Sequence, residues 1–214
     1  AAGGGAAAGD ALLTAALPPA GWVPADGAVY LQADHPQLYE RVGILPSHLT
    51  DPAAWVARSL PASASWFSIA FGAGLFVAVA RWSSNAATSP DGVAWTQRQL
   101  PVISNWRSIA YGNGLFVAVA HNSSNVVTST DSVSWTLRSL PESGNERNVV
   151  YGNGLFVVVS LGSTAAFTSP DGVVWTRRNL PSAHSWASVC YGNGMFVAVA
   201  SGSNAALTSP DGIT

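Results

Sequence analysis

The sequence is poor in charged side chains and contains no lysine. Asp, Glu, Arg and Lys make up 9% of its 214 residues, all nine cations are arginine, and the formal net charge is −2. A nucleic-acid-binding surface needs clustered basic side chains, and none are clustered here, so no nucleic-acid partner is expected. The longest apolar runs, residues 75–80 and their copies, are strand-sized. A spanning helix needs roughly 18 apolar residues, so no membrane insertion is expected.

Cysteine and histidine are also scarce, with one and four residues respectively. The one cysteine, Cys190, stands where equivalent positions carry Ala70, Ala110 and Val150, which predicts a small residue buried in a strand. A single cysteine excludes an internal disulfide. The four histidines are scattered and have no metal-ligand spacing, so neither a metal site nor a cofactor is expected.

What the sequence has in place of charge is a repeat with a period of forty residues. Units begin at residues 66, 106, 146 and 186, and the fourth unit stops at Thr214. The period also reaches backwards, because Trp55 and Leu60 precede Trp95 and Leu100 by forty positions. A strict period of this length is the signature of an array of supersecondary units.

Each unit contains the pattern of four short strands joined by tight turns. The second strand is apolar on both faces and must therefore be covered on both faces. Gly-Asn-Gly and Pro-Asp-Gly supply residues that tolerate the backbone conformations of tight turns. In the first unit we predict strands at 67–71, 75–80, 86–89 and 93–99, turns at 72–74, 81–85 and 90–92, and a strand end at Leu100–Pro101.

Four antiparallel strands in about forty residues, with two-sided apolar patterns, predict an all-β fold built from β-propeller blades. About four blades' worth of sequence is present, over residues 48–214. A β-solenoid is the alternative, and hairpin turns after every strand disfavour it because solenoid strands run parallel.

The number of blades stays open at this point. Residues 53–58 match the fourth strand of a unit, and the chain stops just before the next fourth strand. The early strand could therefore complete the last blade and close a four-bladed ring, which would remove exposed sheet edges. The alternative is a natural chain that continues into further blades.

The S-P-D-G-x-x-W segment, which reads S-T-D-S-x-x-W in the second unit and is present only as S-P-D-G-I-T in the fourth, resembles the Asp-box of sialidases and related propellers, with its glycine one place early. The Asp-box is a structural turn between third and fourth strands, so the resemblance implies a turn-stabilising role without catalysis. The residues concerned are Asp91, Asp131, Asp171 and Asp211.

The region before the repeat divides into two segments. Residues 1–17 are mostly Ala and Gly, which predicts a linker, or an arm that packs in an oligomer. In residues 18–47, Asp34 can cap a short helix that Gly43 ends. This segment resembles the phage tail collar domain through Pro19, Gly21, Trp22, Asp26 and Gly27, followed by Pro36, Leu38, Tyr39, Val42 and Gly43.

The collar resemblance implies a bacteriophage tail fibre or tail tip protein. It further implies a location in the virion, other tail proteins as partners, and a homo-oligomer, with a trimer favoured. The expected function is a structural or receptor-binding one, in which propeller loops face a glycan or protein receptor on the host surface. A secreted or surface lectin-like propeller, located outside the cell, is the alternative.

Comparison of the copies separates two sets of loops. The first-to-second and third-to-fourth turns barely vary, whereas the second-to-third turns and the junctions between units diverge. In an up-and-down blade the divergent loops share one end, which is either a passive surface or a binding face. The candidate binding residues on that end are Arg81, Trp82, His121, Asn122, Glu142, Asn145 and His184.

A catalytic constellation is not evident, and we expect a protein that is not an enzyme. A sialidase-type hydrolase needs paired carboxylates, and Glu142 and Glu146 are too few outside the turns to build them. Such a hydrolase is the third and weakest hypothesis. Trp82 occurs once, in a divergent loop, which makes it a better binding candidate than the tryptophans that repeat.

Overall fold

The computed structural model describes residues 55–214, apart from the side chain of Arg147. The Gly/Ala-rich arm, the collar-like segment and its predicted helix lie outside the described residues. Within them, every regular element is a β-strand, and no helix is long and apolar enough to cross a membrane.

The strands form four antiparallel sheets whose strand order follows the sequence. The predicted propeller blades are therefore confirmed, and the parallel solenoid is excluded for this part of the chain. The blades are β1 (Ser65–Gly72), β2 (Leu75–Arg81), β3 (Ser83–Ser89) and β4 (Thr96–Ser104); β5 (Trp106–Gly112), β6 (Leu115–Ala120), β7 (Ser123–Ser129) and β8 (Thr136–Gly144); β9 (Glu146–Gly152), β10 (Leu155–Ser160), β11 (Ser163–Ser169) and β12 (Thr176–His184); and β13 (Trp186–Gly192), β14 (Met195–Ala200) and β15 (Ala206–Ser209).

Several strand boundaries of the first blade differ from the prediction. The first strand is longer at both ends (Ser65–Gly72), and the third strand begins at Ser83 rather than at residue 86. The fourth strand begins at Thr96 rather than at residue 93, and it passes through Leu100–Pro101 to Ser104. Strand β4 tolerates the proline because the pairing jumps there, from Asn85 opposite Gln99 to Ser83 opposite Ser104. A bulge leaves backbone groups unpaired, which suits a residue without an N–H.

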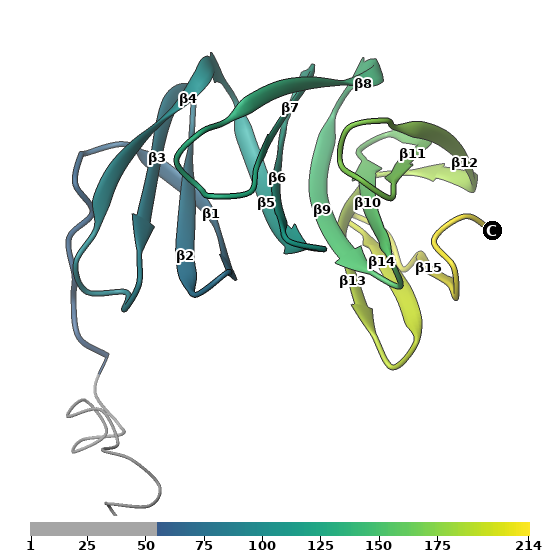
Figure 1. Ribbon diagram of the computed structural model, residues 1–214. Helices are drawn as coiled ribbons and strands as arrows, with labels where there is room; N and C mark the ends of the chain where they lie inside the picture. Colours follow the sequence, from purple (N-terminus) through teal and green to yellow (C-terminus); the bar gives the residue numbers. More distant parts are fainter. Residues whose placement is uncertain (1–54) are drawn as a thin grey trace, which may run out of the picture. The chain divides into compact units, whose positions relative to one another are not determined.

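The hydrophobic core lies between consecutive sheets. The first cluster joins Val77 and Val79 of β2 to Phe116 and Ala118 of β6, and the next cluster joins the opposite face of β6 to β10. Each middle strand is thus apolar on both faces because it packs against a blade on either side. In Figure 1 the four sheets of residues 57–214 follow one another along an arc, with β1 and β13 in its first and last sheets.

Side chains of the first strands lock each blade to the next. The hydroxyl of Ser68 accepts the N–H of Ile109 at 3.2 Å, and the hydroxyl of Ser108 accepts the N–H of Val149 at 3.1 Å. Glycine at position 112 leaves room for the ring of Tyr151, since a Cβ there would lie 1.9 Å from a ring carbon. These contacts make the first strands the inner layer of the arc.

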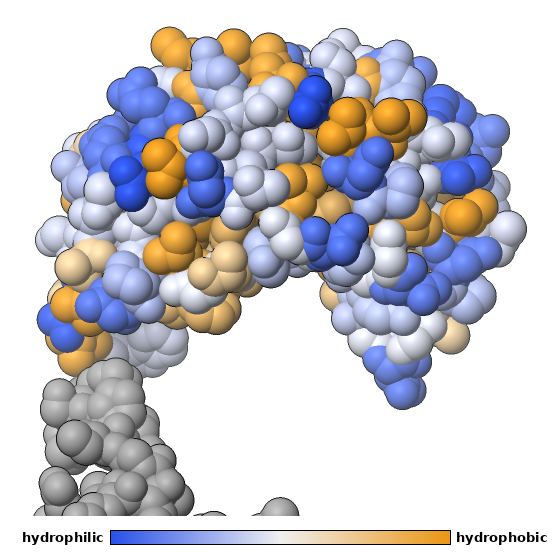
Figure 2. Space-filling view, viewed as in Figure 1, coloured by the Kyte–Doolittle hydropathy of each residue, from blue (hydrophilic) through white to orange (hydrophobic). Residues whose placement is uncertain are grey.

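The first and last blades each have one face that is not packed against a neighbouring blade. Ile69 of β1 is 55% exposed, whereas its equivalent Ile109 is 5% exposed. Cys190 is exposed, so its predicted burial is wrong, because no further blade lies against that side of β13. Residues 57–60 form no strand, and the last sheet contains three strands among the described residues. Elsewhere, Figure 2 shows hydrophilic and hydrophobic side chains interspersed over the visible surface of the blades.

Candidate binding face

The turns of each blade gather at two opposite ends, which we call the repeated end and the divergent end. At the repeated end, Asn153 of a first-to-second turn donates from Nδ2 to the carbonyl of Pro210 in the neighbouring blade's third-to-fourth turn, at 3.3 Å. At the divergent end, the N–H of His121 donates to the carbonyl of Asn105 at 2.9 Å. That bond joins a second-to-third turn to a junction between blades, as the sequence predicts.

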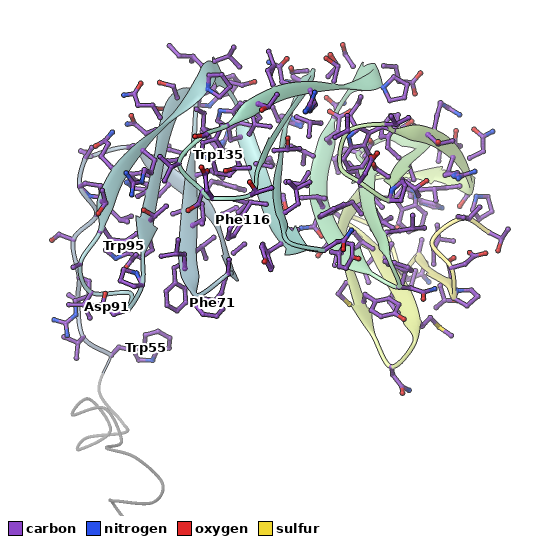
Figure 3. All side chains as sticks on the ribbon, viewed as in Figure 1. Trp55, Phe71, Asp91, Trp95, Phe116 and Trp135 are labelled. Carbon is purple, nitrogen blue, oxygen red and sulfur yellow. The ribbon has the colours of Figure 1, made fainter. Side chains whose placement is uncertain are left out.

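The aspartates of the repeated end hold their own turns. Asp91 Oδ1 accepts the N–H groups of Val93 and Ala94 at 2.8 and 3.0 Å, and the hydroxyl of Ser89 lies 3.0 Å away. Trp95 then closes the turn, donating from Nε1 to the carbonyl of Gly92 (Figure 3). Equivalent carboxylate contacts recur at Asp131, Asp171 and Asp211.

The same hydrogen bonds keep these aspartates ionised. Backbone N–H groups of Ser134 and Val133 lower the pKa of Asp131 to about 2, and the pKa values of Asp91, Asp171 and Asp211 are lowered for the same reason. These backbone N–H groups already donate to a carboxylate of their own turn and are therefore not free to bind a ligand. These contacts stabilise the turns.

The divergent end holds a cluster of cationic and aromatic side chains, which we call the arginine–aromatic cluster. The guanidinium carbons of Arg81 and Arg107 lie 4.9 and 4.5 Å from the centroid of the Phe67 ring. Trp82, whose side chain is 63% exposed, extends the cluster, with Arg81 5.9 Å from its ring. Two guanidinium groups on one ring concentrate positive charge beside exposed aromatic surface.

Asn105 connects this cluster to the next blade. Its side-chain oxygen accepts from Nε of Arg81 at 3.0 Å, and its backbone carbonyl accepts the N–H of His121. The imidazole Nδ1 of His121 in turn lies 3.2 Å from the carbonyl oxygen of Glu146. Arg81, Trp82 and His121 are thus brought into one network, whereas Phe67, Arg107 and Asn105 were missed by the sequence analysis.

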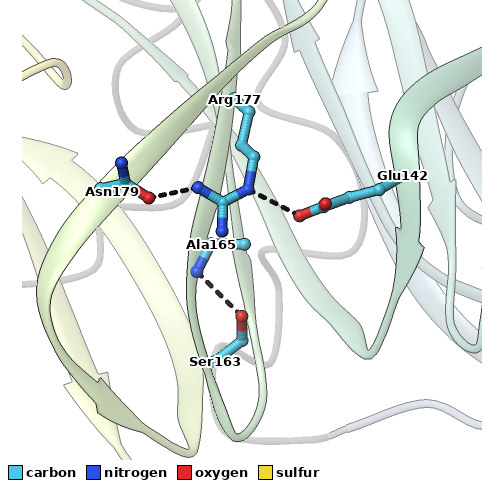
Figure 4. Close-up of polar contacts among 5 residues, drawn as sticks. All are labelled: Glu142, Ser163, Ala165, Arg177 and Asn179. Carbon is cyan, nitrogen blue, oxygen red and sulfur yellow. Dashed lines mark hydrogen bonds and ion pairs between the residues drawn. The ribbon is translucent and has the colours of Figure 1, made fainter.

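The other predicted binding residues are placed elsewhere. Glu142 of β8 forms an ion pair with Arg177 of β12, with 2.8 Å between the carboxylate oxygen and Nε, and Arg177 also contacts Asn179 (Figure 4). His184 packs edge-on against Trp186, with ring centroids 5.3 Å apart. Asn122 has a left-handed backbone, with φ of 57°, and Asn145 accepts the N–H of Leu161.

One buried carboxylate breaks the repeat. Glu146 stands where Trp66, Trp106 and Trp186 begin their blades, and Ser160 opposite it replaces an alanine. Glu146 is fully buried, and neither its carboxylate oxygens nor the Ser160 hydroxyl has a hydrogen-bond partner in the structure. Burial raises the pKa of Glu146 to about 7, with a smaller effect from the charge of Glu142. The substitutions are visible in the sequence as a break at two positions of the repeat.

An apolar cavity of about 130 Å³ lies between the last two blades. Its lining includes Val157, Leu180 and Phe196, each forty residues after a member of the cluster that surrounds Trp175, namely Val117, Leu140 and Phe156. The cavity is therefore the counterpart of the tryptophan site in the preceding blade. It belongs to the packing of the repeat, and its polar lining residues are Arg178, Asn179, Thr208, Ser209 and Thr214.

Comparison with solved structures shows the fold class: the described part of the chain is a β-propeller fold. The chain matches a structure of YCF48 bound to D1 peptide over 77% of its length and 56% of that chain, with a TM-score of 0.62 and 20% identity. It matches virginiamycin B lyase from Staphylococcus aureus over 73% of its length and 59% of that chain, with a TM-score of 0.61 and 13% identity.

A computationally designed protein, Ika4, is also similar, at 11% identity and a TM-score of 0.54; the match covers 73% of this chain and 98% of the designed one. No protein-family model and no curated protein matches the sequence. The chain spans somewhat more than half the length of YCF48 and the lyase. At these identities the likeness establishes the fold, and a fold shared by a lyase and a peptide-bound protein does not decide whether this chain is an enzyme.

Proposed function

We propose that this protein is a non-enzymatic structural or receptor-binding component of a bacteriophage tail, located in the virion. The collar-like segment at residues 18–47 would attach the chain to other tail proteins, and the propeller would present its divergent end to the host surface. The observation that supports a binding role is the arginine–aromatic cluster formed by Phe67, Arg81, Trp82 and Arg107.

The chemistry of the cluster favours an acidic surface glycan as the receptor. Arginine recognises carboxylate and phosphate groups through paired N–H donors. The exposed ring of Trp82 offers a flat apolar face, which suits the apolar face of a sugar ring. Of the acidic side chains that the structure describes outside the aspartate turns, Glu142 pairs with Arg177 on outer strands and Glu146 is buried, so neither belongs to the cluster.

Binding of purified protein to acidic and neutral host polysaccharides, measured by calorimetry, tests this proposal. Arg81→Ala and Arg107→Ala should each weaken binding to the acidic polysaccharide about tenfold, since a hydrogen bond to a charged group contributes about 1.5–3 kcal/mol. Arg177→Ala is the matched control, because Arg177 lies on an outer strand away from the cluster. Failure of the unmodified protein to bind host cells or their glycans would overturn the proposal.

A secreted or surface lectin-like propeller unrelated to phage remains the second candidate. The same cluster supports it, because acidic glycans are as accessible to a lectin as to a tail protein. The two candidate functions differ in whether the protein is part of a virion. Detection of the chain in purified virions by mass spectrometry supports the tail protein, whereas glycan binding by a protein absent from virions supports the lectin.

A further inference from the structure

The turn between the second and third strands of each blade holds one residue in the left-handed backbone region. The residues at this position are Trp82, Asn122, Gly162 and Gly202, with φ of 55°, 57°, 64° and 72°. Glycine adopts this conformation freely and asparagine tolerates it, whereas a bulky side chain there costs free energy. Of the four described blades, only the first carries a bulky side chain at this position. The backbone of Trp82 is therefore strained.

Contacts within the fold do not offset this strain. The Trp82 side chain is 63% exposed and belongs to none of the three clusters of buried side chains. Its indole N–H has no hydrogen-bond partner among the described residues, whereas Trp66 and Trp95 donate to nearby carbonyls at 3.0 and 3.1 Å. Local strain of this kind is typical of residues that serve a function. The exposed indole is thus suited to contact a ligand.

Arg81, the preceding residue, is held with its terminal nitrogens free. Its Nε donates to the side-chain oxygen of Asn105 at 3.0 Å, and its guanidinium carbon lies 4.9 Å from the centroid of the Phe67 ring. Among the described side chains, no hydrogen bond or ion pair engages its two terminal nitrogens. These nitrogens form a planar fork of N–H donors, which matches the oxygens of an acidic group. Arg107, on the same Phe67 ring, adds a second cation.

The distance between the indole and this fork limits the size of the recognised unit. The guanidinium carbon of Arg81 lies 5.9 Å from the centroid of the Trp82 ring. A sugar ring packed on the indole lies about 4 Å from it, and a charged hydrogen bond spans about 2.8 Å between nitrogen and oxygen. A sugar ring on Trp82 therefore brings an acidic group of its own within reach of Arg81, and that contact needs no neighbouring sugar.

We propose that a single sugar residue makes both contacts: its ring packs on Trp82, and an anionic group carried by the same sugar binds Arg81 and Arg107. This inference rests on the proposed function, in which the divergent end binds an acidic glycan, and it names the unit that is recognised. The ligand class is a uronic acid or a sulfated hexose. A neutral sugar linked to a separate acidic residue does not belong to this class.

NMR titration of the isotope-labelled full chain tests whether one sugar is enough. The probes are methyl glucuronide, a sulfated methyl glucoside and neutral methyl glucoside. At least one acidic glycoside should shift both the indole N–H signal of Trp82 and the Nε–H signal of Arg81, and the neutral glycoside should bind about tenfold more weakly. The acidic glycoside that binds more tightly identifies the anionic group. Signals that shift together only with longer oligosaccharides, or equal binding of the neutral glycoside, would overturn the proposal.

Trp82→Gly separates a functional role from a structural one. Because glycine relieves the left-handed strain, the folding equilibrium constant from urea denaturation should rise about fivefold, while binding of the acidic glycoside should fall about tenfold. Ser132→Gly is the matched control and should leave binding unchanged. Ser132 also has a left-handed backbone, with φ of 60°, where the equivalent turns carry Gly92, Gly172 and Gly212. Trp82→Phe, which keeps a ring and the strain, should retain most of the binding.

A Trp82→Gly variant that is less stable than the unmodified protein, or that binds the acidic glycoside equally well, would contradict this inference. Failure of the proposed function gives a different result, because a protein that binds no host glycan responds to neither the glycosides nor the polysaccharides. Binding of an acidic polysaccharide by the unmodified chain, with equal binding by Trp82→Gly, leaves the proposed function intact and overturns this inference alone.

Discussion

The repeated and divergent ends of the blades differ in what holds their backbone. At the repeated end, side chains do so: Asp171 and Ser169 accept the N–H groups of their own turn. At the divergent end, a backbone bond recurs, such as that from Leu161 to the carbonyl of Asn145, and one serine hydroxyl in each blade, such as that of Ser163, accepts a backbone N–H. The side chains that differ from blade to blade at this end are not among these recurring contacts, which explains how one scaffold carries different residues in each blade.

Among single substitutions that test this difference between the two ends, the largest expected effect on stability is at Gly172, at the repeated end. Its φ is +69°, and a Cβ would lie 2.8 Å from Leu115 and 2.9 Å from Val117 of the neighbouring blade. Gly172→Ala should therefore lower the free energy of unfolding by about 3–4 kcal/mol, from backbone strain and overpacking together. Urea denaturation measures the change.

Gly92→Ala is the matched control for that experiment. The backbone at Gly92 is similar, with φ of +73°, but the nearest atom to a Cβ lies 3.8 Å away, on Phe76 of the exposed first blade. Only the backbone strain remains, so the cost should be about 1 kcal/mol. Equal losses in the two variants would show that packing between blades does not distinguish these turns.

At the divergent end, the buried Glu146 should make stability depend on pH. Because the pKa of Glu146 in the folded protein, about 7, lies above its ordinary value of 4.5, the folded state binds the extra proton in this window. Stability should therefore fall as the pH rises from about 4.5 to about 7, by on the order of 2–3 kcal/mol.

Glu146→Gln tests this assignment, because the amide has nearly the same size and cannot ionise. The variant should match the unmodified protein near pH 4.5 and exceed it in stability near pH 8, measured by thermal or urea unfolding across the range. Parallel pH profiles for the two proteins would show that another group is responsible.

The aspartates of the repeated end should make stability depend on pH in the opposite direction, with stability lost as the pH falls. The pKa of Asp131 is lowered to about 2, so its contribution is fully present above about pH 4 and is lost as the pH falls through about 2. Asp131→Asn should remove this part of the acid dependence. An NMR titration of the carboxylate gives the pKa directly, and an unshifted value would contradict the turn contacts.

The smallest expected effect is at Glu142. Its ion pair with Arg177 joins two half-exposed side chains, and such pairs contribute about 0.5 kcal/mol or less. Glu142→Gln should change urea stability by no more than that, and high salt should abolish the difference. A loss above 1 kcal/mol would show that this pair is a structural contact between blades.

Prediction from the sequence succeeded where local chemistry repeats. Gly-Asn-Gly and Pro-Asp-Gly, or the variants Gly72-Ala73-Gly74 and Thr130-Asp131-Ser132, form the tight turns of each unit, so the strands and the two ends of the blade were predictable. The extension of β4 past Pro101 was not, because the bulge depends on pairing with β3. Phe67 and Arg107 were missed because each belongs to a first strand. Phe67 meets Arg81 between two strands of one blade, and Arg107 reaches the Phe67 ring only when the next blade stacks on the first.

The sequence by itself determined the repeating unit, its antiparallel strands and its two-sided apolar faces, because turn residues and strand periodicity act within forty residues. Only the tertiary structure decided which faces are covered. Ile109 and Ile69 are the same residue in equivalent strands, and a neighbouring blade buries the first while the second stays exposed. Burial is a property of contacts between units, and a pattern that is equivalent in every unit cannot encode which unit stands at the end.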